Sequence, residues 1–324
     1  MVRTKLLCTL SGGPYNRRVP DNAEPIDAST RYCAVYGHPI SHSASPAMQN
    51  AALVHLGLNW RYLAFDVDPS HLREAIIGAA RMKFIGLNLT VPHKLLAQEI
   101  VDVLDQSAKT WGAVNTIRFE GRTADGQWVS LGALENCDSQ EIRSHGFNTD
   151  AEAITRSLVE DLSIRLPGAR VLLLGAGGAG RVAALKLASE QISELYLINR
   201  TRSKAEALAA EISKRFPQVK TTVGYPTDKA DLLLNATSLG LNANDDLPFD
   251  PNRYHLSSAR AVYDMVYRPA ETALLKTARQ AGCRTANGAG MLLYQGARAL
   301  EIWTGHAAPI EIMRRALLNH IYGD

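Results

Sequence analysis

The sequence predicts an α/β protein of two domains, on three observations. It has 324 residues, of which 46% are hydrophobic and 21% charged, a size and composition typical of a globular protein with two domains. Short apolar segments of strand length alternate with helical segments along most of the chain, which predicts largely parallel sheets. A glycine-rich motif follows one apolar strand and opens a helix, which predicts a Rossmann-type domain: Gly175-Ala176-Gly177-Gly178-Ala179-Gly180.

The first alternating series begins at Tyr32, after a segment rich in Gly, Pro, Asn, Asp and Arg that predicts a loop or an extension over residues 1–31. The expected elements are strand 32–36, helix 46–56, strand 61–67, helix 69–81, strand 84–89, a helix from about Pro92 and strand 114–119. Residues 120–145 are polar and weakly patterned, which predicts a long hairpin or excursion. This order predicts an N-terminal α/β domain with a mostly parallel sheet at residues 32–151.

The second series follows a helix that begins near Asp150 and a break at Leu166-Pro167-Gly168, which we take as the boundary between the series, give or take a few residues. It contains strand 171–174, a helix from Gly178, strand 194–199, helix 203–215 and strands 220–223, 231–235 and 261–265. This order is typical of a doubly wound cofactor-binding domain, at residues 152–287. Helices 288–304 and 309–321 lie beyond it, and we expect residues 288–324 to return to the first domain and complete it.

Composition argues against several classes of function. The formal net charge is only +3 and the 35 basic residues are spread along the chain, so we expect no nucleic-acid partner. No apolar run approaches the ~18 residues of a membrane span, and no signal-peptide core is evident. The four cysteines form neither a close pair nor a metal-ligand cluster with the nine histidines: Cys8, Cys33, Cys137 and Cys283. We therefore expect a reduced, cytoplasmic protein without a metal, acting on a small molecule as a monomer or homodimer.

The glycine-rich motif predicts a dinucleotide site. Glycines permit a tight turn and close approach of a pyrophosphate, and the N–H groups at the helix start favour its charge. The expected contacts are Gly175, Ala176, Gly177, Gly178 and Ala179.

The end of the next strand favours NADP over NAD. An acidic residue that would bind a free ribose 2′-hydroxyl is absent there, and the chain instead has Asn199-Arg200-Thr201-Arg202-Ser203-Lys204. Arg200 can pair with a 2′-phosphate, with Asn199, Thr201 and Lys204 beside it. The alternative is that Arg200 and Lys204 only solvate a helix start.

A candidate reactive group lies in the first domain, where Asn88-Leu89-Thr90-Val91-Pro92-His93-Lys94 places a lysine just past a short apolar strand. Pro92 suits the first helical turn because its missing N–H has no partner there. The alternative is an ordinary solvated lysine. Polar clusters also stand at other junctions: Ser41-His42-Ser43-Ala44-Ser45-Pro46, Asn115-Thr116 and Asn148-Thr149-Asp150. Taken singly, Ser45 and Asp150 could be plain helix N-caps.

Taken together and in order, these motifs resemble the shikimate dehydrogenase family. The resemblance runs from about Tyr32 to the C-terminus and includes three further motifs: Asn235-Ala236-Thr237-Ser238, Tyr263-Asp264-Met265-Val266-Tyr267, and Gly288-Ala289-Gly290-Met291 leading to Gln295. It implies an NADP-dependent dehydrogenase that interconverts 3-dehydroshikimate and shikimate, with C-terminal helices that return to the N-terminal domain.

The resemblance also implies the residues of the site. Lys94 and Asp150 would be the catalytic pair. The implied substrate ligands, of which the two serines hold the carboxylate, are Ser43, Ser45, Asn88, Thr90, Asn115, Asp150, Tyr267 and Gln295. The nicotinamide side of the cleft between the domains would be lined by Thr237, Met265, Gly288 and Met291.

These residue types suit the implied chemistry. Reduction of a ring ketone needs hydride at carbon and a proton at the developing alkoxide. A lysine ammonium can stabilise that oxyanion and donate the proton, and a neighbouring carboxylate can orient the lysine. Small polar side chains suit a hydroxylated substrate, because they discriminate by paired hydrogen bonds.

Three features depart from the family pattern. Ala151 stands where a glycine usually follows the aspartate, Phe147 replaces a polar neighbour, and residues 120–145 form a longer segment than expected. We therefore expect the local shape around Asp150 to differ.

Alternatives remain at this stage. A quinate or dual quinate/shikimate dehydrogenase, using NAD or NADP, shares nearly every motif, although the two serines and Arg200 favour shikimate and NADP. A catalytically silent metabolite sensor is a more distant alternative, because a fold does not guarantee activity. A Rossmann enzyme acting on a folate or an amino-acid derivative would not need the serine pair.

Overall fold

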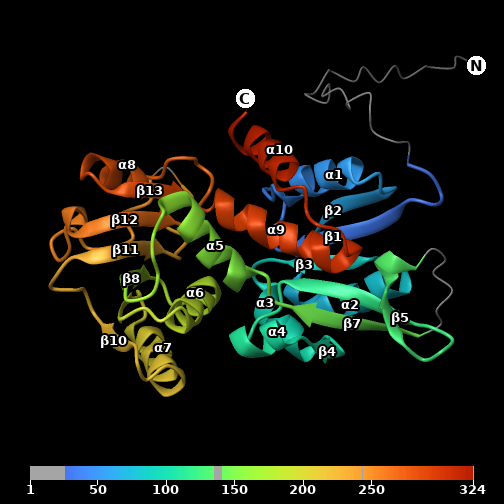
Figure 1. Ribbon diagram of the computed structural model, residues 1–324, viewed down its shortest axis with the longest axis horizontal. Coiled ribbons are helices and arrows are strands. Elements are labelled where there is room, and N and C mark those ends of the chain that lie inside the picture. Colours follow the sequence, from blue (N-terminus) through green and yellow to red (C-terminus); the bar gives the residue numbers. More distant parts are fainter. Residues whose placement is uncertain (1–25, 135–140, 243, 324) are drawn as a thin grey trace, which may run out of the picture.

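The computed structural model describes residues 26–134, 141–242 and 244–323, which form two sheets connected by helices. Helices α5 (Asp150–Leu162) and α9 (Ala289–Thr304) lie between the two sheets (Figure 1). Most of the predicted extension lies outside the described residues. In its last part, the hydroxyl of Thr30 donates to the side chain of Asn59 at 3.0 Å, and the first strand begins at Arg31.

The first sheet has the strand order β2-β1-β3-β5-β7-β4, with β6 paired to β5. Its strands are β1 (Arg31–Gly37), β2 (Trp60–Asp66), β3 (Gly86–Leu89), β4 (Val103–Leu104), β5 (Thr116–Arg122), β6 (Trp128–Ser130) and β7 (Ile142–Phe147). Its helices are α1 (Ser45–His55), α2 (Leu72–Arg81), α3 (His93–Leu96) and α4 (Gln106–Trp111). Within the described residues, β5 runs against its neighbours β3, β6 and β7, and the other strands share one direction.

The reversed direction of β5 decides where the polar clusters lie. Thr116, the first residue of β5, pairs with Asn88 on β3 and with Phe147 on β7. The start of β5 therefore shares one edge of the sheet with the ends of β3 and β7. The polar residues that precede β5 and follow β3 and β7 meet at that edge.

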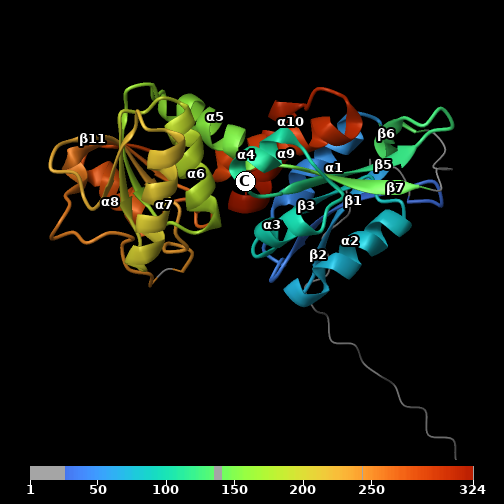
Figure 2. The same ribbon diagram turned by 90° about the horizontal axis from the view of Figure 1, so that it is seen from below.

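The C-terminal helices complete the first domain. Figure 2 shows α9 and α10 (Ile310–Tyr322) on one side of the first sheet and α2 on the other. The indole of Trp303 on α9 is buried against Tyr62 and donates to the carbonyl oxygen of Ile117 on β5 at 2.9 Å. The amide of Gln49 on α1 donates to the carbonyl oxygen of Gly296 at 2.9 Å. The predicted return of these helices is confirmed.

The second sheet is fully parallel, with the strand order β10-β9-β8-β11-β12-β13. Its strands are β8 (Arg170–Leu174), β9 (Glu194–Ile198), β10 (Lys220–Val223), β11 (Ala230–Asn235), β12 (Ala259–Asp264) and β13 (Arg284–Asn287). Helices α6 (Gly178–Ser189), α7 (Arg202–Arg215) and α8 (Ala273–Gln280) pack on it, together with α5. This is the Rossmann order, in which the strand sequence reverses beside β8.

The apolar run at β8 illustrates why the central strands of this domain can be predicted from the sequence. Val171 and Leu173 pack into the core beneath α5, α6 and α7, whereas Leu172 and Leu174 pack into the core beneath α8. A parallel strand covered by helices on both faces has no polar face, so its sequence is continuously apolar.

The predicted α/β fold class is confirmed, but several elements escaped prediction. The polar segment 120–145 contains β6 and the start of β7, while residues 135–140 lie outside the described part. β7 is polar because Arg143 and His145 surround the buried carboxylate of Glu120 on β5. Burial opposes ionisation of Glu120, but hydrogen bonds from His145 and the arginines outweigh it and lower its pKa to about 2. Helices α4 and α8 and strands β4 and β13 were also absent from the prediction.

Across the described residues, no helix combines the length and apolar character needed to cross a bilayer.

We predict that Trp303→Ala lowers the free energy of unfolding by about 3–5 kcal/mol, because it opens a cavity between α9 and the first sheet. Urea denaturation, monitored by far-ultraviolet circular dichroism of the backbone, measures this change. Met82→Ala is the control, since that side chain is 64% exposed and its loss should change stability by less than about 0.5 kcal/mol. Equal effects of the two substitutions would show that α9 does not anchor the first domain.

Candidate active site

A cavity of about 210 Å³ lies where the two domains meet. The predicted site residues that line it are Ser43, Ser45, Asn88, Thr90, Lys94, Asp150, Ala179, Met265, Tyr267, Gly288, Met291 and Gln295. They come from the polar edge of the first sheet, from the start of α6, from the end of β12 and from α9. His42 also lines the cavity, although we had not predicted a role for it.

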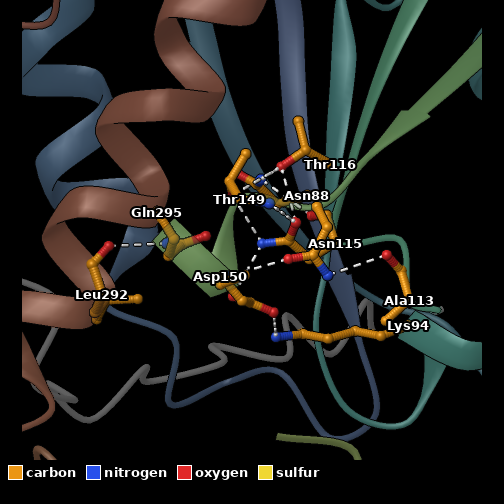
Figure 3. A network of polar contacts seen from close by, with 11 residues as sticks. Asn88, Lys94, Ala113, Asn115, Thr116, Thr149, Asp150, Leu292 and Gln295 are labelled. Atoms are coloured by element: carbon orange, nitrogen blue, oxygen red, sulfur yellow. Dashed lines mark hydrogen bonds and ion pairs between the residues drawn. The ribbon is translucent and has the colours of Figure 1, made fainter. Parts of the chain in front are cut away.

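Lys94 on α3 and Asp150 on α5 form an ion pair (Figure 3), and both residues line this cavity. The ammonium Nζ lies 2.7 Å from Oδ2 of Asp150, with 28% of the lysine side chain and 8% of the aspartate side chain exposed. Asp150 is the first residue of α5, where the helix dipole favours a negative charge. The lysine is therefore held in a cleft by a buried carboxylate, and the interpretation of Lys94 as a solvated surface lysine is wrong.

Asn115 holds the other oxygen of the carboxylate. Its amide nitrogen donates to Oδ1 of Asp150 at 3.0 Å and to the hydroxyl of Thr149 at 2.9 Å, and its amide oxygen accepts the backbone N–H of Thr149 at 2.7 Å. Asn115 is buried and is not among the residues lining the cavity. Both amide hydrogens are used within the protein, so this side chain positions Asp150.

The N-cap alternatives for Ser45 and Asp150 are also wrong. The N-caps of α1 and α5 are Ala44 and Thr149, and neither makes a side-chain capping hydrogen bond. Asn148 accepts the backbone N–H of Ala151 at 3.1 Å instead. The serine hydroxyl and the carboxylate are thus available to the cavity.

A second cavity, of about 630 Å³, lies over the glycine-rich motif at the carboxyl edge of the second sheet. The predicted cofactor residues that line it are Gly175, Gly177, Asn199, Arg200, Thr201, Lys204 and Thr237. Gly175 has φ +103°, and a Cβ at Gly180 would come within 2.1 Å of the carbonyl oxygen of Gly175. These two glycines allow the turn and the close packing of α6.

The same motif leaves room for a pyrophosphate. A Cβ at Gly177 or Gly178 would meet no atom within 4 Å, and no side chain caps the N-terminus of α6. Asn199 accepts the backbone N–H of Ala176 at 2.9 Å and thereby ties the loop to the end of β9. This arrangement fits a dinucleotide phosphate.

The cations beyond β9 are exposed. Arg202 forms an ion pair with Glu206 along α7, whereas within the described part of the chain no ion pair engages Arg200 or Lys204. Two cations without anions at a helix N-terminus work against its dipole, and a bound phosphate would remove that conflict.

Comparison with known proteins agrees with this geometry. Family models match residues 35–117 as the shikimate dehydrogenase substrate binding domain, 157–240 as shikimate / quinate 5-dehydrogenase and 288–318 as the shikimate 5′-dehydrogenase C-terminal domain. A shikimate dehydrogenase (NADP(+)) of Methanopyrus kandleri is 42% identical over 303 residues, covering 91% of this chain and 98% of that protein.

This chain belongs to the shikimate dehydrogenase family. Among solved structures, shikimate 5-dehydrogenase of Thermus thermophilus in complex with NADP(H) and shikimate is 34% identical, with a TM-score of 0.74 over 89% of this chain and 98% of that one. Quinate dehydrogenase of Corynebacterium glutamicum in complex with NAD is 28% identical, with a TM-score of 0.74 over 90% and 99%. The family therefore includes both enzymes between which the sequence left a choice.

The departures from the family pattern are accommodated locally. The methyl group of Ala151 is fully buried in the core shared by Trp111 and Ile154. The ring of Phe147 packs on His145 with centroids 4.5 Å apart, and the guanidinium of Arg118 lies over it at 5.3 Å. With these residues in place, Nζ of Lys94 lies 2.7 Å from Oδ2 of Asp150.

Sequence reasoning missed Tyr62 on β2. Its hydroxyl donates to the amide oxygen of Asn88 at 2.7 Å. Asn88 in turn donates to the carbonyl oxygen of Asn115 at 3.2 Å and to the hydroxyl of Thr116 at 3.0 Å. Tyr62 thus fixes the amide so that one lone pair of its oxygen remains for a ligand hydroxyl. Burial raises the pKa of Tyr62 well above its ordinary value, so the phenol stays a donor. No sequence signal marked this tyrosine, because β2 is an edge strand with several exposed residues and the burial of Tyr62 depends on its tertiary neighbours.

We predict that Tyr62→Phe lowers kcat/KM for the hydroxylated substrate about 5- to 30-fold, because a hydrogen bond worth about 1–2 kcal/mol no longer orients Asn88. Steady-state kinetics measure the change, and the KM for the dinucleotide should stay the same. Tyr36→Phe on β1 is the matched control, since Tyr36 is buried and packs edge-on against Phe65. An unchanged kcat/KM in Tyr62→Phe would exclude this role.

Proposed function

We propose that this chain is an NADP-dependent shikimate dehydrogenase, which reduces 3-dehydroshikimate to shikimate reversibly. The observation that carries the proposal is the Lys94–Asp150 ion pair, which stands in a cavity lined both by the polar edge of the first domain and by Ala179 of the cofactor loop. Shikimate lies on the biosynthetic route to aromatic amino acids, so the enzyme would belong to that route.

The ion pair suits proton transfer to a ring oxygen. NADPH, when bound, supplies the hydride that adds to the carbonyl carbon. As negative charge develops on the oxygen, the ammonium of Lys94 stabilises it and donates a proton. Asp150 orients the lysine through its 2.7 Å contact and is itself held by Asn115. In the oxidative direction, the neutral amine of Lys94 accepts the hydroxyl proton.

The substrate residues are divided between two ends of the cavity. Ser43 and Ser45, at the start of α1, would donate hydroxyl hydrogen bonds to the carboxylate of the substrate. Asn88, Thr90, Asp150, Tyr267 and Gln295 would contact the ring hydroxyl groups. The amide nitrogen of Gln295 donates to the carbonyl oxygen of Leu292 at 2.9 Å, and its amide oxygen would accept a hydrogen bond from a ligand. A site built to pair hydroxyl groups rejects ligands that lack them.

The cofactor proposal follows from the charge beyond β9. Arg200 and Lys204 would hold the 2′-phosphate of NADP, with Asn199 and Thr201 beside it. Gly175, Ala176, Gly177, Gly178 and Ala179 would surround the pyrophosphate, and Thr237, Met265, Gly288 and Met291 would lie along the nicotinamide side. NAD is the weaker alternative because it lacks the phosphate that these cations would bind.

Turnover assays with shikimate and quinate, each with NADP⁺ and NAD⁺, test this proposal directly. We expect the highest kcat/KM with shikimate and NADP⁺. Preference for quinate would support the alternative dehydrogenase, whose substrate carries an extra ring hydroxyl group. Binding of shikimate without any turnover would support the metabolite sensor.

The remaining expectations stay part of the proposal. We propose a cytoplasmic enzyme that acts on a small molecule, as a monomer or a homodimer and without a nucleic-acid partner. Cys33 and Cys283 are free and buried. In the described part of the chain, no group of three or more histidine, cysteine or acidic residues is arranged to hold a metal ion.

We predict that Lys94→Ala lowers kcat at least about 100-fold with little change in KM, because the lysine acts mainly in the transition state. Initial rates of NADPH formation measure the loss. Lys276→Ala, on the exposed side of α8, is the control and should keep the parental rate. A near-parental kcat in Lys94→Ala would exclude its catalytic role.

We predict that Arg200→Ala raises the KM for NADP⁺ about ten-fold or more, because a charge-assisted contact with the phosphate is lost. The KM for NAD⁺ should change much less. Arg202→Ala, at the first position of α7, is the nearby control, since Arg202 pairs with Glu206. Equal losses with both dinucleotides would mean that Arg200 supports the loop and does not read the phosphate.

A further inference from the structure

The segment 110–115 touches both the cofactor domain and the catalytic pair. The indole of Trp111 belongs to the core cluster of the second domain, which also contains Ile154 and Val182, and Nζ of Lys186 on α6 lies 5.8 Å from its ring centroid. A few residues later, the backbone N–H of Val114 donates to the carbonyl oxygen of Lys94 at 2.9 Å. Asn115 then holds the carboxylate of Asp150. Any shift of this short segment moves the groups that fix both catalytic side chains.

Two arginines of the second domain, held together by a glutamate, donate hydrogen bonds to the backbone of this segment. Arg181 on α6 donates to both carboxylate oxygens of Glu211, at 2.9 and 2.7 Å, and to the carbonyl oxygen of Trp111 at 2.8 Å. Arg215 on α7 donates to Glu211 at 3.1 Å and to the carbonyl oxygen of Thr110 at 2.8 Å. We call Arg181, Glu211 and Arg215 the clasp. Burial opposes ionisation of Glu211, but hydrogen bonds and charge from the two arginines outweigh that effect, so the pKa of Glu211 lies below its ordinary value. The carboxylate therefore stays ionised in the clasp.

Gly112 fits the clasp for two reasons. It has φ +63°, a conformation that favours glycine, and it ends α4. A Cβ at this position would lie 2.9 Å from Nη1 of Arg181. The absence of a side chain therefore lets the guanidinium reach the carbonyl oxygen next to it.

We propose that the clasp is a positioning device that sets the catalytic pair against the cofactor loop. Arg181 lies in the first turn of α6, which begins at Gly178 of the glycine-rich motif. Because a helix turn is rigid, the clasp and the phosphate-binding loop move as one body. Segment 110–115, which the clasp holds, then fixes where Lys94 and Asp150 lie relative to that loop. The inference rests on the proposed dehydrogenase function, since it concerns the placement of Lys94 for that reaction. None of the three clasp residues lines either cavity.

Kinetics of clasp variants test this proposal. Arg181→Ala and the isosteric Glu211→Gln should each lower kcat about ten-fold or more, because small displacements of reacting groups reduce rates steeply. The KM for shikimate should change less than about three-fold, since the substrate ligands stay in place. Arg181→Lys should rescue only part of the rate, because lysine lacks the planar fork that reaches both partners. Arg202→Ala, which removes an exposed ion pair on α7, is the matched control and should keep the parental kcat.

Hydrogen–deuterium exchange gives a second readout that does not depend on turnover. Backbone exchange over residues 110–115 should rise in Arg181→Ala and Glu211→Gln and stay parental in Arg202→Ala. Faster exchange with an unchanged kcat would overturn the positioning role. A raised KM for NADP⁺ with an unchanged kcat would also overturn it, because Arg181 would then serve only the phosphate loop. If the parent protein itself fails to oxidise shikimate while exchange rises as expected, the proposed function fails and the grip on segment 110–115 stands.

Discussion

The ion pair between Lys94 and Asp150 is the interaction on which the rest of the site depends. It joins residues 56 positions apart, one on the short helix after β3 and the other at the first position of α5. These positions meet because β3 and β7 run in the same direction, so that their ends share one edge of the sheet, and the reversed β5 brings its own start, with Asn115, to that edge. A sheet with β5 in the common direction would place Asn115 at the opposite edge and leave the carboxylate of Asp150 without that partner.

Holding a charged pair in a cleft requires compensation for lost hydration. The carboxylate receives it from three sources: the ammonium at 2.7 Å, the amide of Asn115 at 3.0 Å and the N-terminus of α5. Lys94 is the more exposed partner, which leaves its remaining N–H groups free to face the cavity. The network continues from Asn115 through Asn88 to Tyr62, so the residues that hold Asp150 and a residue that lines the cavity share one hydrogen-bonded framework.

Most elements of the second domain could be predicted from sequence, with α8 and β13 as the exceptions. Its central strands β8 and β11 are largely apolar and buried, and the glycine-rich motif specifies its own context, a strand before it and a helix after it. The first domain was harder, because its local sequence does not describe its tertiary environment. β7 has little apolar character since Arg143 and His145 face the buried Glu120, an arrangement that exists only when β5 and β7 pair. The residues that bond to Tyr62 and Arg181 are likewise far from them in sequence, so local patterns could not reveal these contacts.

The candidate site divides in the same way. Lys94 could be noticed from its strand and turn, and the cofactor loop from its glycines. The roles of Ser43, Ser45, Asn88, Asn115, Tyr267 and Gln295 were expected only from the family resemblance. Physical pattern alone gave Ser45 and Asp150 the ordinary alternative of capping helices, and only the observed N-caps excluded it. In the structure, Asn115 does not line the cavity but belongs to the site because it holds the carboxylate of Asp150.

A crystal structure of the ternary complex with NADP⁺ and shikimate would test the central claim most directly. The account predicts that Nζ of Lys94 lies within hydrogen-bonding distance, about 2.7–3.2 Å, of the substrate hydroxyl group that faces the nicotinamide, with its contact to Asp150 intact. A complex in which Nζ points into bulk solvent, away from both the substrate and Asp150, would contradict it.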